Sequence, residues 1–180
     1  MKVKLLFFVI FLFAITSSFA HQPILNSDEE MSPDKPYVIE NPEISKAIYS
    51  TLEGSDHYYV ISSEKPFNFY AGLTVPKIND CDDFLRFSFA VLDNDFHIIQ
   101  EFDGQKYHWW KWYEPYGKNF KSSNTFDAGT YYIKVYNKDN IGKYVLAVGD
   151  IEKFTPAVID KTLVTLPIIN NKFWDKSNCN

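Results

Sequence analysis

The stretch AGTYYIKVYNKDNIGKYVLAVG, residues 128–149, predicts two β-strands joined by a tight turn. Apolar and more polar residues alternate in both halves, and an alternation of period two puts one face of each strand into a core. Residues 137–142, NKDNIG, favour a turn, and Gly142 permits backbone angles that other residues resist. We therefore expect a closing hairpin whose apolar face consists of Tyr131, Ile133 and Val135, then Tyr144, Leu146 and Val148.

Upstream of this stretch the chain contains further short runs rich in aromatic and β-branched residues, each bounded by glycine, proline or Asx turns. One of them has an apolar face made of Leu85, Phe87, Phe89 and Val91. Six to eight strands spaced by roughly 8 to 14 residues are typical of an antiparallel sandwich. We predict an all-β, jelly-roll-like single domain with strands near 44–52, 56–63, 66–75, 84–93, 96–104, 130–137 and 143–150.

The N-terminal residues 1–20 have the features of a signal peptide. Lys2 and Lys4 precede an apolar run, and the small residues Ser18 and Ala20 fit cleavage after position 20. The run is shorter than the roughly 20 residues of a comfortable membrane span, although an uncleaved anchor is the alternative. The sequence therefore predicts a secreted or periplasmic protein with no membrane span after the signal is removed.

The rest of the chain divides into three parts. Residues 21–36 are polar and acidic and contain three prolines, so we expect a flexible arm. Residues 37–154 form the predicted β-sandwich. The tail, residues 155–180, is expected to be helical or irregular, with a short helix that begins at Pro156 and ends at Pro167.

The hairpin stretch resembles a known family. The opening Ala-Gly-Thr-Tyr at 128–131, the following Ile-x-Val and the returning Gly-x-Tyr-x-Leu-x-Val at 142–148 are similar to bacterial pre-peptidase C-terminal domains. The resemblance is specific over 128–149 and loose over 36–151. The resemblance implies a small secreted jelly-roll sandwich. Domains of this family usually accompany secreted enzymes as accessory domains, and some of these domains bind matrix polymers or calcium. With 180 residues there is no room for a protease domain, so we expect a free-standing domain.

Composition and motifs narrow the function classes. The net charge is −5 and no basic cluster follows the leader, so nucleic acid and anionic membranes are poor partners. The motifs GxSxG, HExxH, SxxK and the P-loop are absent, so we expect no enzyme and no cofactor. Cys81 and Cys179 could pair in an oxidising compartment, but nothing in their positions requires a disulfide.

The densest aromatic segment is YHWWKWYEPYG, residues 107–117. As one strand it would place His108, Trp110 and Trp112 on one face and Trp109 on the other. Aromatic rings on an outward face suit stacking against sugar rings, whereas rings on an inward face would fill the core. We predict a non-catalytic module that binds a polysaccharide, or another envelope component, through Trp109, Trp110, Trp112, Tyr113, Glu114 and Tyr116.

Two alternatives stay open. Cleavage after Ala20 would leave His21 at the N-terminus, where its amine and imidazole could bind copper for a carrier or an oxidase. The second ligand would be His57, His97 or His108, and their spacing selects none of them. The other alternative is a structural or protein-interaction domain without a small ligand.

Acidic turns at 79–83 (NDCDD) and 93–95 (DND) gather oxygen atoms of the kind that calcium prefers. Neither has the spacing of an EF-hand, and aspartate and asparagine are common in turns for their own hydrogen-bonding reasons. We interpret both as solvated turns and predict no metal site.

Overall fold

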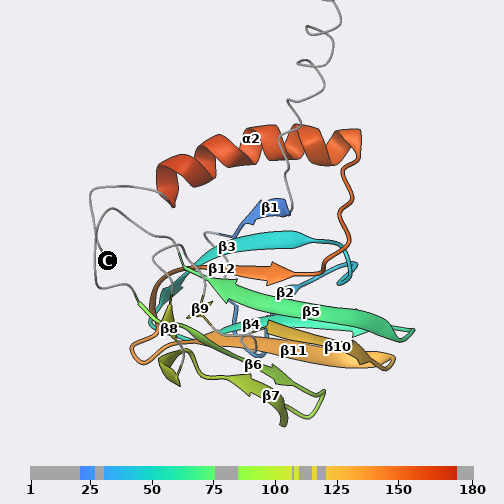
Figure 1. The fold of residues 1–180 in the computed structure, drawn as a ribbon, viewed down its shortest axis with the longest axis vertical. Helices are drawn as coiled ribbons and strands as arrows, with labels where there is room; N and C mark the ends of the chain where they lie inside the picture. Colours follow the sequence, from blue (N-terminus) through green and yellow to red (C-terminus); the bar gives the residue numbers. More distant parts are fainter. Residues whose placement is uncertain are drawn as a thin grey trace, which may run out of the picture.

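The strands of the 128–149 stretch form within one or two residues of their predicted ends, as β11 (Gly129–Tyr136) and β12 (Ile141–Val148). They do not pair with each other, so the predicted hairpin is wrong. In the computed structural model, which describes residues 21–26, 31–75, 85–106, 108–109, 115–116 and 121–173, the two strands belong to different sheets. The chain crosses between the sheets at the 137–140 turn, and the strands face each other across the core (Figure 1).

Two five-stranded sheets make up the β-sandwich that the sequence predicts. Sheet 1 has the order β1 (Gln22–Leu25), β3 (Lys46–Glu53), β12, β5 (Phe67–Thr74) and β10 (Lys121–Phe126). Sheet 2 has the order β2 (Tyr37–Val38), β4 (His57–Ser63), β11, β6 (Ser88–Leu92) and β7 (Ile98–Phe102). All pairs are antiparallel except the two edge pairs, β1 with β3 and β2 with β4, which are parallel.

The core lies between the two sheets and is built from the inward positions of alternating strands. Ile133 and Val135 of β11 face Leu146 and Val148 of β12, and all four side chains are fully buried. Gly142 is needed for the close packing at one end, because its φ is +99° and a Cβ there would lie 2.2 Å from Leu85 Cδ1. The largest fully buried side chains are Tyr59, Tyr144, Phe69, Phe87, Phe89, Ile48, Leu52, Ile61, Leu73, Ile133 and Leu146.

Residues 21–26 and 31–36, the described parts of segment 21–36, are not the flexible arm that the composition suggested. Residues 22–25 form β1, which pairs with β3 from Gln22 opposite Lys46 to Leu25 opposite Tyr49. Met31 is only 3% exposed and packs into the main core. The segment is acidic and rich in proline on average, but apolar residues such as Ile24 and Met31 are enough to hold its described parts against the core.

The tail forms one 17-residue helix, α2 (Pro156–Lys172), which begins at Pro156 as predicted. Thr155 caps it by accepting a hydrogen bond from the Val158 N–H, at 3.3 Å. The helix does not end at Pro167 but continues to Lys172. Pro167 is exposed and its missing N–H would have bonded to the carbonyl of Leu163, which is 61% exposed, so water can satisfy that carbonyl.

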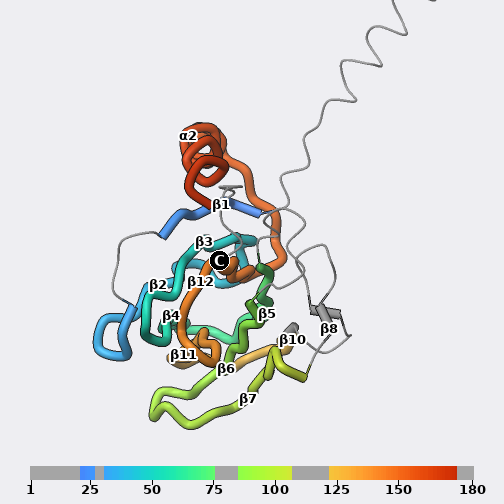
Figure 2. Tube along the Cα trace, turned by 90° about the vertical axis from the view of Figure 1, so that its left-hand side faces the viewer, coloured from blue at the N-terminus to red at the C-terminus, as the bar shows by residue number. Residues whose placement is uncertain are grey.

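α2 packs along β1, the edge strand of sheet 1 (Figures 1 and 2), and its C-terminal end reaches the outer face of the neighbouring strands β3 and β12. Ile169 and Phe173 from the helix end meet Ala47 of β3 and Val145 of β12 in a second, smaller apolar cluster. No helix in the described part of the chain is long and apolar enough to cross a membrane. Beyond the two sheets, the chain forms a 3₁₀ turn η1 (Gly104–Lys106) and a small ladder of β8 (His108–Trp109) with β9 (Pro115–Tyr116).

Candidate aromatic binding surface

Four aromatic side chains gather on the outer face of sheet 2. The inward residues of β11 are Ile133 and Val135, so its intervening residues point outward and include Tyr132 and Tyr136. Each of the four rings is partly exposed, and Phe96 is 42% exposed. We call this set the aromatic surface; it consists of Tyr58, Phe96, Tyr132 and Tyr136.

The strand register explains how the aromatic surface is laid out. In the row through the middle of the sheet, Lys134 lies between Tyr58 of β4 and Ala90 of β6, and Glu101 of β7 follows Ala90. Tyr136 lies opposite Ser88 of β6. Ser88 and Ala90 of β6 are thus small residues beside the large side chains of Tyr136 and Lys134, and both are buried on this outer face.

Phe96 reaches the aromatic surface from the turn between β6 and β7. Its ring stacks on Tyr132, with 4.4 Å between the ring centres and 24° between the planes, and lies 6.3 Å from the ring of Tyr58. Phe96 has a φ of +62°, in the left-handed region that a bulky residue rarely adopts. The backbone at Phe96 is therefore strained, and this conformation places the Phe96 ring against Tyr132 on the sheet.

Charged and hydrogen-bonding groups are fixed among the rings. The Lys134 ammonium pairs with Asp56 at 2.6 Å and lies 5.0 Å from the centre of the Tyr136 ring. The Tyr136 hydroxyl donates to Glu101 Oε1 at 2.6 Å. Partial burial lowers the pKa of Lys134, but the hydrogen bond and charge of Asp56 outweigh this and leave the pKa raised. Partial burial, with the carboxylate of Glu101, raises the pKa of Tyr136, so it keeps its proton at neutral pH.

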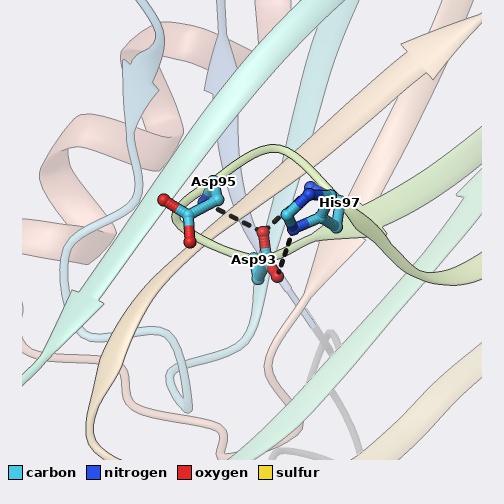
Figure 3. Close-up of side chains that lie close together, drawn as sticks. All are labelled: Asp93, Asp95 and His97. Carbon is cyan, nitrogen blue, oxygen red and sulfur yellow. Dashed lines mark hydrogen bonds and ion pairs between the residues drawn. The ribbon is translucent and has the colours of Figure 1, made fainter.

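Asp93 shapes the turn that carries Phe96 (Figure 3). Its Oδ1 accepts hydrogen bonds from the backbone N–H of Asp95 at 2.9 Å and of His97 at 2.8 Å, and its Oδ2 lies 3.3 Å from His97 Nδ1. The N–H of His97 is the largest cause that lowers the pKa of the Asp93 carboxyl. The carboxylate thus acts as an internal cap that closes the turn.

Asp93, Asp95 and His97 also form the one group of three metal-ligating side chains in the part of the chain that the structure describes. Their ligand atoms lie within 4.8 Å of one another. Both oxygens of Asp93 already serve the turn, and calcium prefers six to eight oxygen ligands, far more than this turn assembles. A solvated turn accounts for the 93–95 cluster. The 79–83 cluster and both cysteines lie outside the described residues.

The aromatic segment at 107–117 is described only in part. Trp109 pairs with Pro115 and His108 pairs with Tyr116, so the segment is two short antiparallel strands and the interpretation as one continuous strand is wrong. Of the predicted ligand-binding residues, Trp109 and Tyr116 lie on this ladder. The others lie outside the described residues, namely Trp110, Trp112, Tyr113 and Glu114.

The histidines of the copper hypothesis lie far apart wherever the structure describes them. His21 Nδ1 is hydrogen-bonded to the Ser45 hydroxyl, whereas His57 Nδ1 lies 3.3 Å from Ser50, five residues further along. At about 3.3 Å per residue, that separation is roughly 16 Å, too far for two imidazoles to share an ion. His97 directly precedes β7, and β7 and β1 lie at opposite ends of the molecule (Figure 1). The side chain of His108 lies outside the described residues.

Sequence reasoning missed the aromatic surface, although its signal was present. The apolar face of the β11 stretch and the dense aromatic segment at 107–117 are the more conspicuous patterns in the sequence. The more polar positions of β11 contain Tyr132 and Tyr136, and an aromatic residue on a strand's outward face is an informative exception. Phe96 gave a weaker signal, because a bulky residue inside an Asx-rich turn has no evident place in the core.

Comparisons with known proteins give a fold likeness and no family. No protein-family model matches the chain, and no curated protein matches it. Among solved structures, the chain is similar to the crystal structure of the pre-peptidase C-terminal domain of a collagenase from Bacillus anthracis. The match covers 72% of this chain and 94% of that one, with 10% sequence identity and a TM-score of 0.39. Residues 128–149 resemble the same kind of domain.

Proposed function

We propose that this chain is a non-catalytic, extracytoplasmic module that binds a carbohydrate chain on the outer face of sheet 2. The observation that carries the proposal is the aromatic surface itself. It consists of four partly exposed rings on one sheet face, with the Lys134 ammonium and the Tyr136–Glu101 pair fixed among them. The apolar C–H faces of sugar rings pack on aromatic rings, and sugar hydroxyls need hydrogen-bonding partners beside them.

Preorganisation supports the same proposal. Tyr58, Tyr132 and Tyr136 lie on paired strands, and Phe96 is held by the Asp93-capped turn, so little conformational freedom remains for a ligand to remove. Strained backbone such as that of Phe96 occurs preferentially at functional sites, where the surroundings maintain it. The extracytoplasmic location rests on residues 1–20 and is part of the proposal.

The aromatic ladder at β8 and β9 remains a second proposed contact region. Trp109, Trp110, Trp112, Tyr113, Glu114 and Tyr116 would offer a polymer a second set of contacts. Substituting Trp109→Ala tests this part separately from the aromatic surface.

A glycan array followed by titration of the best ligand tests the proposal. We expect Tyr132→Ala to weaken binding by about tenfold, because it removes one ring and the support of Phe96. The matched control is Tyr70→Ala, which removes a partly exposed tyrosine from β5 of sheet 1. The proposal fails if no glycan binds, or if the two variants bind equally well while both remain folded.

A further inference from the structure

A groove lies at the edge of the sandwich where β1 and β2 are the outermost strands of the two sheets, and it is separate from the aromatic surface. It has a volume of about 680 Å³ and runs between the edge strands β1 and β2 and the beginning of α2. Both edge strands lie on the same side of the molecule in Figure 2. Ile24, Tyr37, Val38 and Val158 supply apolar walls. Its size falls within the range of small-molecule sites in proteins.

The charged residues of the groove are mostly basic. Lys46, Lys153 and Lys161 line it, against the single carboxylate of Glu40. This local excess of two positive charges is found in a chain whose net charge is −5. Lys153 and Lys161 are exposed and come from the segment before α2 and from its second turn. The groove is therefore a cationic pocket on an acidic protein.

Lys46 makes the groove more than a set of surface lysines. It is only 9% exposed, and its ammonium donates to the carbonyls of Asn41 at 2.8 Å and Ile44 at 3.0 Å. These two bonds use two of the three donors of an ammonium group and neutralise none of its charge. Burial lowers the pKa of Lys46, and the charge of Glu40 only partly opposes this. An anion bound in the groove would stabilise this buried charge.

The beginning of α2 adds a fourth favourable element. Thr155 and Val158, from the cap and the first turn of the 17-residue helix, line the same groove. The N-terminus of a helix carries a partial positive charge that favours a nearby anion. The Val158 N–H is already capped by Thr155 and Pro156 has no N–H, so the contribution of α2 is this partial charge. The backbone before the helix is held in place, because the Gln22 side-chain amide donates to the Lys153 carbonyl at 2.6 Å.

We propose that this groove binds a tetrahedral oxyanion, a phosphate or sulfate group, carried on a small molecule or on a polymer. Lys46 would hold the anion at the floor, and Lys153 and Lys161 would close on it from the helix side. The groove is separate from the aromatic surface, since it is formed by β1, β2, the first residue of β3 and α2 rather than by the outer face of sheet 2. A polymer that carries such groups could engage both regions at once.

Titration calorimetry with the purified full-length protein tests this site, using pyrophosphate for the small-molecule source and dextran sulfate for the polymeric source. Uncharged dextran controls for the sugar backbone. We expect one or both anions to bind and the double variant Lys153→Glu/Lys161→Glu to weaken that binding more than tenfold. The matched control is Lys138→Glu, an exposed lysine on the turn between β11 and β12.

Lys46→Met then tests the floor of the groove, since methionine keeps much of the apolar stem and removes the charge. We expect it to weaken the binding of pyrophosphate at least fivefold while the circular dichroism spectrum is unchanged. Equal binding by the double variant and the Lys138→Glu control would overturn the proposal, as would the absence of binding to either anion at low ionic strength, where charge screening is weakest.

Discussion

The two sheets of this sandwich have the same number of strands and share one core, but their outer faces differ. On sheet 1, Tyr49 packs edge-on against Phe173 of the C-terminal segment, with 5.1 Å between the ring centres. On sheet 2, Tyr132 stacks on Phe96, which is itself 42% exposed. An outward tyrosine is thus covered by α2 on one sheet and left partly open on the other. Covered aromatics contribute to stability, whereas open ones are available to a ligand.

The largest expected effect is on the covered face. Phe173→Ala should destabilise the domain by about 3 kcal/mol, because Phe173 is 2% exposed and anchors the end of α2 on sheet 1. Denaturant unfolding followed by tryptophan fluorescence measures the change. Ile168→Ala, on the exposed side of the same helix, should change stability by less than about 1 kcal/mol. Equal effects of the two variants would mean that Phe173 does not anchor the end of α2 on sheet 1.

Acid should lower the stability of the core between the two sheets, because it protonates a buried histidine. Burial lowers the pKa of His57 to about 4, and the charge of Asp56 only partly opposes this. The buried ring instead shares a 2.8 Å hydrogen bond with Tyr144, which bonds to Tyr59 at 2.6 Å. A lowered histidine pKa means that the neutral form is favoured on folding. Stability is therefore full above the unfolded value near 6.5 and falls as the pH drops from there towards 4.

The expected loss from His57 across this interval is about 2 kcal/mol. Denaturant midpoints measured at pH 7 and pH 4.5 would show it, and a His57→Gln variant, although less stable overall, should lose less between the two values. A midpoint difference that is identical in the two proteins would exclude His57 as the titrating group.

On the open face, Lys134→Met should reduce stability only slightly. The ion pair with Asp56 is partly exposed, and such pairs contribute about 1 kcal/mol or less. If the aromatic surface binds carbohydrate, the same variant should weaken glycan binding severalfold, because it removes the cation at the centre of the rings. Thermal melting and glycan titration of one preparation would separate the two effects. A large loss of stability would make Lys134 a structural residue instead.

The smallest expected change in stability is at Phe96. Asparagine tolerates a φ of +62° better than phenylalanine does, so Phe96→Asn should relieve strain while it removes the stack on Tyr132. We expect a net change within about 0.5 kcal/mol, together with a clear loss of glycan affinity. A variant that is more stable and binds as well would show that Phe96 serves neither the fold nor the ligand.

Many of the strands could be predicted from the alternation of apolar and polar residues in the sequence. Where the prediction was wrong, the reason is physical. The strands β3 to β7, β11 and β12 were expected from short runs of aromatic and β-branched residues, and in all of them except β7 the apolar residues also recur with period two. The pairing of β11 with β12 was wrong, because alternation is the same whether two strands pair at their edges or face each other across a core. β10, KSSNTF, was missed because its residues are polar, yet Phe126 stacks on Phe69 at 4.5 Å and Ser122 is hydrogen-bonded to Gln100 of sheet 2.

The candidate site was harder to predict than the fold. The aromatic surface combines residues from β4, β11 and the turn before β7, which are distant in sequence and meet only through the strand order of sheet 2. The groove also combines residues that are distant in sequence, since Lys46 precedes Lys153 and Lys161 by more than 100 residues. Local density of one residue type, as at 107–117, is easy to see in a sequence, whereas convergence of distant residues is not.

The parallel pairing of β1 with β3, with α2 packed beside it, has a practical consequence for attachment. Leu25 near the start of the described domain and Phe173 at its end lie in the same apolar cluster, so both ends leave the sandwich on the side of sheet 1. α2 and the β6–β7 end of sheet 2 lie at opposite ends of the molecule (Figures 1 and 2). Attachment through either end, for example immobilisation on a sensor chip through a terminal tag, would therefore leave the aromatic surface facing the solution.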